Sequence, residues 1–214
     1  MNQQILRTTV DHLVVLAATL DEGSRWCTRL LGVTPSPGGQ HPLMGTHNRL
    51  VNISSFAYPD TYLEIIALDP EAQSQRAPGL KRWFDIDDPV LLAQVARDGP
   101  QLIHFVARCP DVQPAMYALG SLGLDCGQVI KASRPTPEGL LQWRITVRDD
   151  GQRLLGADVA GEPRLEAFDE LALGGDPSRV EALVHVGLLL FPEFRLVNGD
   201  SNRGRHARFC CASR

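Results

Sequence analysis

Several features that mark common classes of binding protein are missing from this 214-residue sequence. No run of Lys or Arg occurs before the last dozen residues, and 21 basic against 25 acidic residues leave a formal net charge of −4. Proteins that bind nucleic acid usually present a basic patch, so we expect no nucleic-acid partner. The sequence also has no Gly-x-Gly-x-x-Gly or Walker-type glycine loop and no Gly-x-Ser-x-Gly elbow. The commonest nucleotide-binding and serine-nucleophile motifs are therefore excluded.

Long apolar runs and paired cysteines are missing as well. No uninterrupted apolar stretch approaches the roughly 20 residues that span a bilayer, and the first residues lack the basic and apolar regions of a secretory signal. The five cysteines are odd in number and form no Cys-x-x-Cys pair. They fit free thiols in a reducing compartment better than a disulfide framework. These absences predict a cytoplasmic protein with no membrane partner.

The sequence does contain a weak internal repeat. Residues 10–15 and 102–107 are short apolar segments with the composition of strands, and each includes one histidine, His12 or His104. A helix-like stretch follows each segment and ends at a glycine, 20 residues after the first histidine and 19 residues after the second. Matched order and spacing favour an internal duplication.

The sequence around the two repeated segments predicts the other helices and strands. Asp21 is the expected N-cap of the first helix and Gly32 its C-cap. Further strands are expected at residues 48–56, 61–68, 125–131 and 140–147, and a helix at 90–97. We divide the chain into a first module (8–68), a connector with a helix (69–100), a second module with a degraded last strand (101–173), a C-terminal helix and extension (174–197), and a disordered tail (198–214).

Three side chains on the predicted strands suggest a metal site. His12 and His104 lie in the two repeated strands, and Glu64 lies in another apolar strand between them. Two histidines with one carboxylate can bind a divalent metal and leave positions open for water or substrate. The three groups can converge if the strand faces that carry them line a concave interior. The alternative stays open: each histidine is a hydrogen-bonded sheet residue, and Glu64 lies on a solvated face.

A second candidate site lies at residues 41–48, where two histidines, a hydroxyl and an amide occur close together. Loops carried on a rigid sheet are where binding groups concentrate. His47 can carry a proton near neutral pH and is the predicted catalytic residue. His41, Thr46 and Asn48 are the predicted substrate-binding residues. The alternative is a loop held by its own hydrogen bonds, which Asn and Thr commonly form.

These motifs together resemble a known family. The runs Asp-His-Leu-Val-Val at 11–15, Met-Gly-Thr-His-Asn at 44–48 and Tyr-Leu-Glu-Ile-Ile at 62–66 are similar to glyoxalase-like proteins of the vicinal oxygen chelate superfamily. The resemblance covers roughly residues 8–150. It implies an α+β fold of paired βαβββ modules that form a curled mixed sheet around a cup, here with an additional C-terminal helix.

The same resemblance implies a divalent metal ion (Fe, Mn, Zn, Ni or Mg) with His12, Glu64 and His104 as ligands. The fourth ligand position departs from the family pattern. The family branch would show a Leu-Pro-x-Leu-Ile-(Asp/Glu)-Trp strand near residue 155, where this chain has Leu-Leu-Gly-Ala-Asp-Val. Asp158 and Glu166 are the carboxylates that can substitute.

The function implied by the resemblance is that of a metal-dependent enzyme acting on a small oxygenated substrate. Isomerase, lyase and dioxygenase chemistry are all open, because a fold does not choose among reactions. One alternative is a non-catalytic protein of the same fold that binds or sequesters a small molecule, and another is a structural or partner-binding relative. The expected partner is a small-molecule substrate, and a homodimer is left open as the assembly.

Overall fold

Strands and helices alternate along the chain in the order expected for two related modules. The computed structural model describes residues 9–54, 56, 58, 60–121, 125–136, 139–153 and 211–213. Its elements are β1 (Thr9–Leu16), α1 (Leu20–Leu31), β2 (Ser36–His41), β3 (Thr46–Asn52), β4 (Tyr62–Leu68), α2 (Pro89–Asp98), β5 (Gln101–Arg108), α3 (Val112–Ser121), β6 (Gln128–Thr136), β7 (Gly139–Val147) and β8 (Cys211–Ser213). The helix predicted at 174–197 lies outside the described residues.

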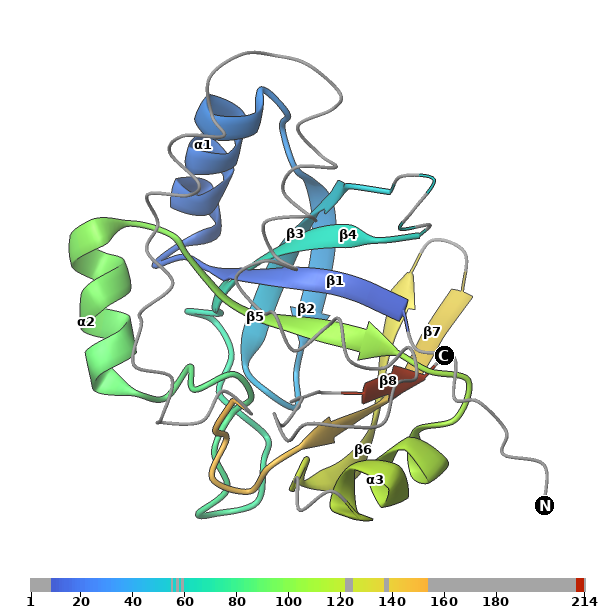
Figure 1. Cartoon of the computed structure of the whole chain (residues 1–214). Helices are drawn as coiled ribbons and strands as arrows, with labels where there is room; N and C mark the ends of the chain where they lie inside the picture. The colour runs from blue at the N-terminus through green and yellow to red at the C-terminus, as the bar shows by residue number, and fades with distance from the viewer. Residues whose placement is uncertain are drawn as a thin grey trace, which may run out of the picture.

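The described strands form one mixed sheet in the order β2-β3-β4-β1-β5-β8-β7-β6. Parallel pairing joins β1 to β4 and β5 to β8, while β3–β4 and β7–β8 are antiparallel pairs. Each half of the sheet therefore repeats one strand arrangement, and the halves meet at the antiparallel pair β1–β5. Figure 1 shows the β6–β7 hairpin at a steep angle to β1 and β5, so the sheet curls. The predicted α+β fold of paired modules is confirmed.

The pairing of β1 with β5 gives His12 and His104, the histidines of the two repeated strands, equivalent positions. His12 lies opposite Val106, and His104 lies opposite Val14. Paired residues share a face of the sheet, and side chains alternate along each strand. Val14 and Val106 both belong to the core on the concave face. Both histidines therefore point to the concave side, as the duplication predicts.

A short strand from the end of the chain occupies the fourth strand position of the second module. In β8, Cys211 pairs with Ala107 and Ala212 pairs with Arg108 in parallel register. Ala212 also pairs with Ile145 of β7. This place beside β5 corresponds to the place of β4 beside β1. These three residues have no recognisable strand pattern in the sequence, and they form a strand because they gain pairing partners on both sides.

Helix α1 is capped at both ends by side-chain and backbone chemistry. Its N-cap is Thr19, whose hydroxyl accepts a hydrogen bond from the backbone N–H of Glu22 at 3.1 Å. The predicted N-cap, Asp21, instead lies in the first turn, where a negative charge favours the helix dipole. Gly32 is confirmed as the C-cap, with a left-handed φ of 69° that glycine adopts without strain. None of the helices in the described part of the chain is long and apolar enough to cross a bilayer.

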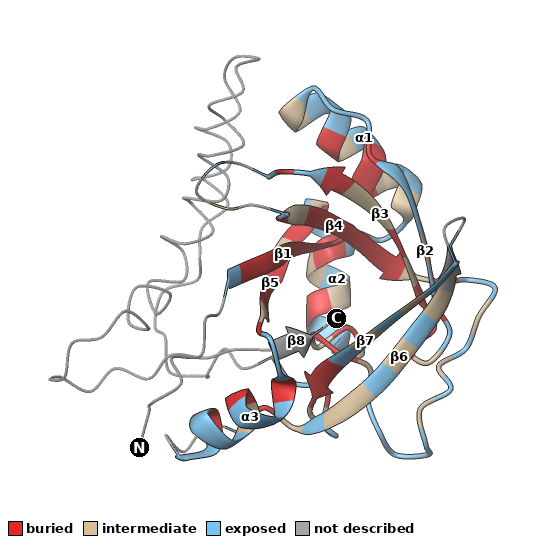
Figure 2. Ribbon diagram, turned by 90° about the vertical axis from the view of Figure 1, so that its right-hand side faces the viewer, coloured by how far each residue is buried: buried red, intermediate tan, exposed pale blue. Residues whose placement is uncertain are grey.

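Apolar cores lie on both faces of the sheet. The outer core packs α1 and α3 against the central strands, and the inner core packs α2 and the connector residues Trp83 and Phe84 into the concave side. Figure 2 shows burial concentrated in β1, β4 and β5, whereas β6 is largely open to solvent. The second hairpin therefore forms an open wall over a well-packed floor.

The connector places Trp83 and Phe84 inside the cup at a cost in backbone strain. Phe84 and Asp85 have φ values of 60° and 57°, which L-residues adopt rarely. The Asp85 N–H donates to the Gly151 carbonyl at 2.9 Å, and Arg153 Nε donates to the Asp85 carboxylate at 2.7 Å. These bonds hold the strained turn against the segment that follows β7.

Candidate active site

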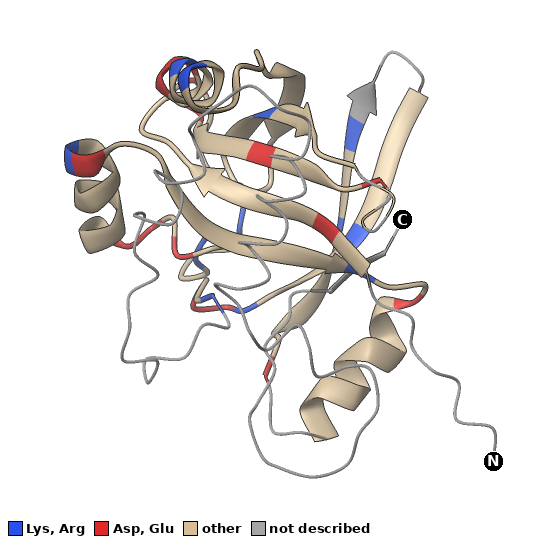
Figure 3. Cartoon of the chain, turned by 45° about the horizontal axis from the view of Figure 1, so that its top comes forward, with Lys and Arg blue, Asp and Glu red and all other residues tan. Residues whose placement is uncertain are grey.

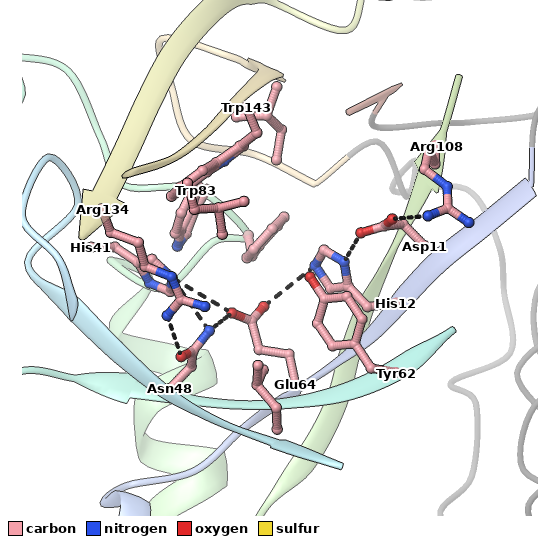
Figure 4. A pocket seen from close by; sticks show the side chains of 14 residues that line it. Asp11, His12, His41, Asn48, Tyr62, Glu64, Trp83, Arg108, Arg134 and Trp143 are labelled. Carbon is pink, nitrogen blue, oxygen red and sulfur yellow. Dashed lines mark hydrogen bonds and ion pairs between the residues drawn. The ribbon is translucent and has the colours of Figure 1, made fainter. Parts of the chain in front are cut away.

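The concave face holds a pocket between the two modules. The space within and in front of it, open solvent included, is about 670 Å³. β1, β3 and β4 form its polar floor, and the connector with the β6–β7 hairpin forms its aromatic and basic wall (Figure 4). The lining residues are Asp11, His12, His41, Asn48, Leu50, Tyr62, Glu64, Trp83, Phe84, Arg108, Arg134, Leu141, Trp143 and Ile145.

Glu64 is the centre of the polar floor. Its side chain is buried, with the residue 5% exposed, and one carboxylate oxygen, Oε1, accepts a hydrogen bond from Asn48 Nδ2 at 2.6 Å. The other oxygen, Oε2, lies 3.5 Å from His12 Nε2. Burial alone would raise the pKa of Glu64, but the hydrogen bonds and charge of these partners outweigh it and lower the pKa to about 2. Glu64 is therefore a carboxylate at neutral pH.

His12 is held between two carboxylates. Its Nδ1 lies 2.9 Å from Asp11 Oδ2, its Nε2 faces Glu64, and its ring stacks on Tyr62 with centroids 4.6 Å apart. Burial would lower the pKa of His12, but Asp11 and Glu64 outweigh burial and raise it to about 9. The resting pocket thus contains an imidazolium paired with the Glu64 carboxylate.

His41 is a neutral imidazole with a defined proton position. Asn48 Oδ1 accepts from the Gly39 backbone N–H at 2.8 Å, which fixes the orientation of the Asn48 amide. Asn48 Nδ2 can then only donate to His41 Nε2, 3.3 Å away, so the ring proton sits on Nδ1, 3.1 Å from Thr46 Oγ1. Burial lowers the pKa of His41 to about 4.

The substrate-binding residues predicted at 41–48 divide into two roles. His41 and Asn48 line the pocket. Thr46 is fully buried and supports His41 from behind. His47 is on β3 one residue from Asn48 and so points to the opposite face of the sheet; it is absent from the pocket lining among the described residues. Its predicted catalytic role stays a prediction.

The predicted ligand His104 faces the cup without reaching the pocket. Its ring lies against Phe84, with centroids 5.1 Å apart, and the residue is 1% exposed. Neither ring nitrogen has a hydrogen-bond partner in the part of the chain that the structure describes. Burial lowers its pKa to about 3, helped by the charges of Arg153 and His12. Phe84 therefore separates His104 from the pocket that His12 and Glu64 line.

Comparison with known proteins identifies the family. A family model described as glyoxalase-like domain matches residues 10–164, well over half of the chain. The chain belongs to the glyoxalase-like domain family. The resemblance carried by the three sequence motifs is therefore confirmed. The curated proteins compared with this chain include no significant match.

Several solved structures are similar to this glyoxalase-like chain at low identity. A hypothetical protein from Staphylococcus aureus is 17% identical with a TM-score of 0.47, covering 66% of this chain and 52% of that protein, so this chain spans about half its length. Methylmalonyl-CoA epimerase from Mycobacterium tuberculosis is 15% identical with a TM-score of 0.41, covering 71% and 87% of the two chains. The enzyme of the same name from Streptomyces coelicolor is 16% identical with a TM-score of 0.41, covering 64% and 84%.

The donors that this glyoxalase-like chain offers to a metal form an incomplete set. His12 Nε2 and Glu64 Oε2 are 3.5 Å apart, which suits neighbouring ligands of one ion with bonds of about 2 Å. His104 stands behind Phe84, and the described residues contain no group of three or more His, Cys, Asp or Glu side chains arranged to hold a metal. The fourth-ligand candidates Asp158 and Glu166 lie outside the described residues. Two of the three predicted ligands therefore meet at the pocket.

Sequence reasoning missed several lining residues of this glyoxalase-like pocket. Asp11 had a signal, since it directly precedes His12, but regular alternation would send it to the other face. Trp83 and Trp143 carry no sequence signal that distinguishes a pocket wall from ordinary core aromatics. Arg134 carried no local signal, because its place beside the first module depends on how the second hairpin folds back. The charged positions are sparse along the central strands in Figure 3, so each one in the pocket stands out only once the fold is known.

Proposed function

We propose that this glyoxalase-like chain is an enzyme that binds a small oxygenated substrate in the pocket and moves a proton on it, in an isomerase or lyase reaction. The observation that carries the proposal is the buried pair of His12 and Glu64, 3.5 Å apart and backed by Asp11 and Asn48. Buried, perturbed acid–base pairs in a pocket are the usual sign of proton-transfer chemistry.

The pair supplies one acid and one latent base. His12, protonated at Nε2, donates to the carbonyl oxygen of the substrate and stabilises the negative charge that develops there. Glu64 takes the proton from the adjacent carbon, and the electron pair of that C–H bond moves to the oxygen beside His12. While His12 donates to Glu64, the pKa of Glu64 is held low. When the substrate oxygen takes over the His12 N–H, Glu64 loses a donor and becomes a stronger base.

The remaining polar groups fix this geometry. Asp11 accepts from His12 Nδ1 and keeps the ring protonated with Nε2 toward the pocket. Asn48 holds the Glu64 carboxylate through Oε1 and leaves Oε2 facing His12. Neutral His41 lies 3.9 Å from Glu64 Oε1 and offers a lone pair at Nε2 once Asn48 shifts. Each of these residues positions the acid–base pair and is expected to affect turnover more than binding.

Deuterium exchange tests this proposal without knowledge of the natural substrate. Small 2-oxo acids such as 2-oxobutyrate are incubated with the protein in D2O, and loss of the C–H signal beside the carbonyl is followed by proton NMR. We expect exchange above the buffer rate and a loss of about 100-fold or more in Glu64→Gln. Glu71→Gln, an exposed carboxylate outside the pocket, is the matched control. Equal rates in wild type, Glu64→Gln and buffer for every acid would contradict the proposal.

A metal-dependent reaction is the second candidate, and one observation favours it. His12 is bonded to a carboxylate through Nδ1 and turns Nε2 toward the pocket and Glu64, and the first of these contacts is the usual arrangement of a metal-binding histidine and its supporting carboxylate. A bound ion would act as a Lewis acid on the substrate oxygens. Titration with Mn²⁺, Ni²⁺ and Zn²⁺ by calorimetry tests it: binding near one ion per chain, with proton release and loss in His12→Ala and Glu64→Ala, supports this candidate. No binding of any of the three ions counts against it.

A binding protein without catalysis is the remaining alternative. The same pocket would then hold a ligand with no exchange or turnover. Ligand binding that persists in both Glu64→Gln and wild type, with neither showing exchange above the buffer rate, distinguishes this alternative from the enzyme.

A further inference from the structure

We propose that Arg134 is an anion-binding subsite of the pocket, and that the substrate is a small organic acid with a planar apolar body lying against the wall formed by Trp83 and Trp143. This proposal rests on the proposed function, because it names the class of substrate for the same pocket. Three observations support it. Arg134 has no carboxylate partner among the described residues, Gly39 leaves space for its guanidinium, and aromatic side chains form the wall beside it.

Two arginines of the described residues line the pocket, and they differ in their partners. Arg108 lies 3.7 Å from the carboxylates of Asp11 and Asp60. Arg134 forms no ion pair with any carboxylate of the described residues, and its contact with Asn48 Oδ1 is long, at 3.4 Å. A guanidinium carries five N–H donors in a fork that matches a carboxylate. Arg134 therefore has both its charge and most of its donors available to a ligand.

The first module is shaped to receive this side chain. Arg134 comes from β6 of the second module and crosses the pocket toward β2 and β3, next to His41 and Asn48 (Figure 4). A Cβ atom at Gly39 would collide with the Arg134 guanidinium. The absence of a side chain at Gly39 thus leaves room for the arginine at the floor of the cup. The same amide oxygen of Asn48 accepts from Gly39 N–H and contacts Arg134, which connects the subsite to Glu64 through Asn48 Nδ2.

The ion pairs around the pocket favour an anion at Arg134. Asp11 faces His12 Nδ1 and Arg108, and Arg108 also faces Asp60. Glu64 faces His12 Nε2 and accepts from Asn48. Both carboxylates of the lining therefore already have basic partners, whereas Arg134 has no carboxylate partner among the described residues. Its charge can therefore pair with an anionic ligand.

The wall beside Arg134 is aromatic and apolar. Trp83 and Trp143 stand edge-on to the His41 ring, with centroid distances of 5.1 Å and 6.3 Å. Leu141 and Ile145 continue this wall on β7. Aromatic walls favour flat apolar bodies, whereas one charged group fixes the orientation of a ligand. A ligand whose acid group meets Arg134 would present its other oxygens to the His12–Glu64 side of the pocket.

A matched pair of probes tests the subsite. Benzoylformate has a flat ring, a carboxylate and a neighbouring carbonyl, and its methyl ester is neutral with the same ring and carbonyl. Binding is measured by quenching of tryptophan fluorescence, since two of the three tryptophans line the pocket. We expect wild type to bind the acid at least tenfold more tightly than the ester, and Arg134→Met to lose that preference. Arg144→Met is the control, because Arg144 is an exposed arginine on the same hairpin and is not among the lining residues.

Three outcomes would overturn the subsite. The first is equal affinity of wild type for the acid and the ester, and the second is an unchanged preference for the acid in Arg134→Met. The third is no binding of either probe at 10 mM, which is about the weakest affinity that one charged contact would give. Partial recovery of the preference in Arg134→Lys supports it, since the charge returns without the fork. Glu64→Gln separates this proposal from the proposed function. A variant that keeps the preference for the acid supports the subsite even if no exchange is seen, and exchange without a preference for the acid supports the proton transfer alone.

Discussion

Asp11 and His12 are consecutive residues of β1 and yet bond to each other, with Asp11 Oδ2 and His12 Nδ1 2.9 Å apart. Regular alternation would send their side chains to opposite faces of the sheet. A register shift between Val10 and His12 in the pairing with β5 marks a local irregularity at this point, of the kind that re-aims side chains beside active sites. The irregularity lets the carboxylate lie behind the imidazole and directs Nε2 to Glu64.

Asn48 is expected to be the most sensitive positioning residue, because one amide serves Glu64, His41 and the Gly39 backbone. In Asn48→Asp the donor to Glu64 becomes a second carboxylate, so the pKa of Glu64 rises and the fold is destabilised by roughly 1.5–3 kcal/mol at pH 8. The loss should shrink toward pH 4, where one of the two carboxylates takes a proton. Urea unfolding at the two pH values measures both effects.

Asn52→Asp, at the exposed end of the same strand, is the matched control for Asn48 and should change stability by less than about 0.5 kcal/mol. Equal effects of the two substitutions would mean that the Asn48 bond to Glu64 contributes nothing specific.

His104→Leu is expected to stabilise the protein by about 1–3 kcal/mol. Both ring nitrogens are buried without a partner among the described residues, and an unsatisfied buried polar group carries a desolvation penalty that leucine avoids. The pKa of His104 lies near 3, below its ordinary value near 6.5, so wild type loses stability as the pH falls through that window and His104→Leu should lose less. Denaturant unfolding from pH 7 to pH 3 measures this.

His41→Leu is the contrasting variant for His104. His41 contacts Thr46 and Asn48, so its replacement leaves buried groups without a partner and should destabilise the fold. A destabilised His104→Leu would show that this imidazole gains a partner in solution, and loss of bound metal in that variant would restore it as a ligand.

Gly38→Ala should be costly, although no positive φ is required there. A Cβ atom would lie 2.5 Å from the carbonyl oxygen and 2.9 Å from the carbonyl carbon of Asn48, and backbone of a paired strand cannot move aside easily. We expect a loss of about 1–3 kcal/mol and a fall in exchange activity, since Asn48 shifts away from Glu64. Thermal unfolding and the deuterium-exchange assay measure the two effects.

Gly120→Ala is the control for Gly38. It lies in α3 with nothing within 4 Å of the added atom, so the substitution should be neutral or stabilise by up to about 1 kcal/mol. A Gly38→Ala protein as stable and active as Gly120→Ala would show that β2 and β3 tolerate a wider separation than the structure has.

Much of the fold could be predicted, because it depends on local patterns. The spacing from His12 to Gly32 reflects a strand and a capped helix, and both features are local. Gly32 caps α1 as expected, and the equivalence of the two histidines follows from the pairing of β1 with β5. The strand β8 could not be predicted, since three residues form a strand only when β5 and β7 present free edges to them.

The site residues also divide into those that local sequence motifs predict and those that long-range packing places. His12, His41, Asn48 and Glu64 stand in short motifs, and strand periodicity places them on one face. The place of Arg134 depends on contact between modules across more than 80 residues of chain. Phe84 separates His104 from the pocket through a strained turn in the connector, which has no sequence signature of its own. Long-range packing, which no local pattern encodes, therefore decides which predicted ligands meet.

The most direct test of the account is the protonation state of His12 in protein labelled with ¹⁵N-histidine. NMR should show His12 as an imidazolium at pH 7.5 that titrates near pH 9, with the titration moving to lower pH in Asp11→Asn. Because its pKa is raised, His12 should contribute stability fully below pH 6.5 and lose that contribution as the pH passes through about 9. A neutral His12 at pH 7.5, with a midpoint at or below 6.5, would contradict the acid–base pair on which the proposed function depends.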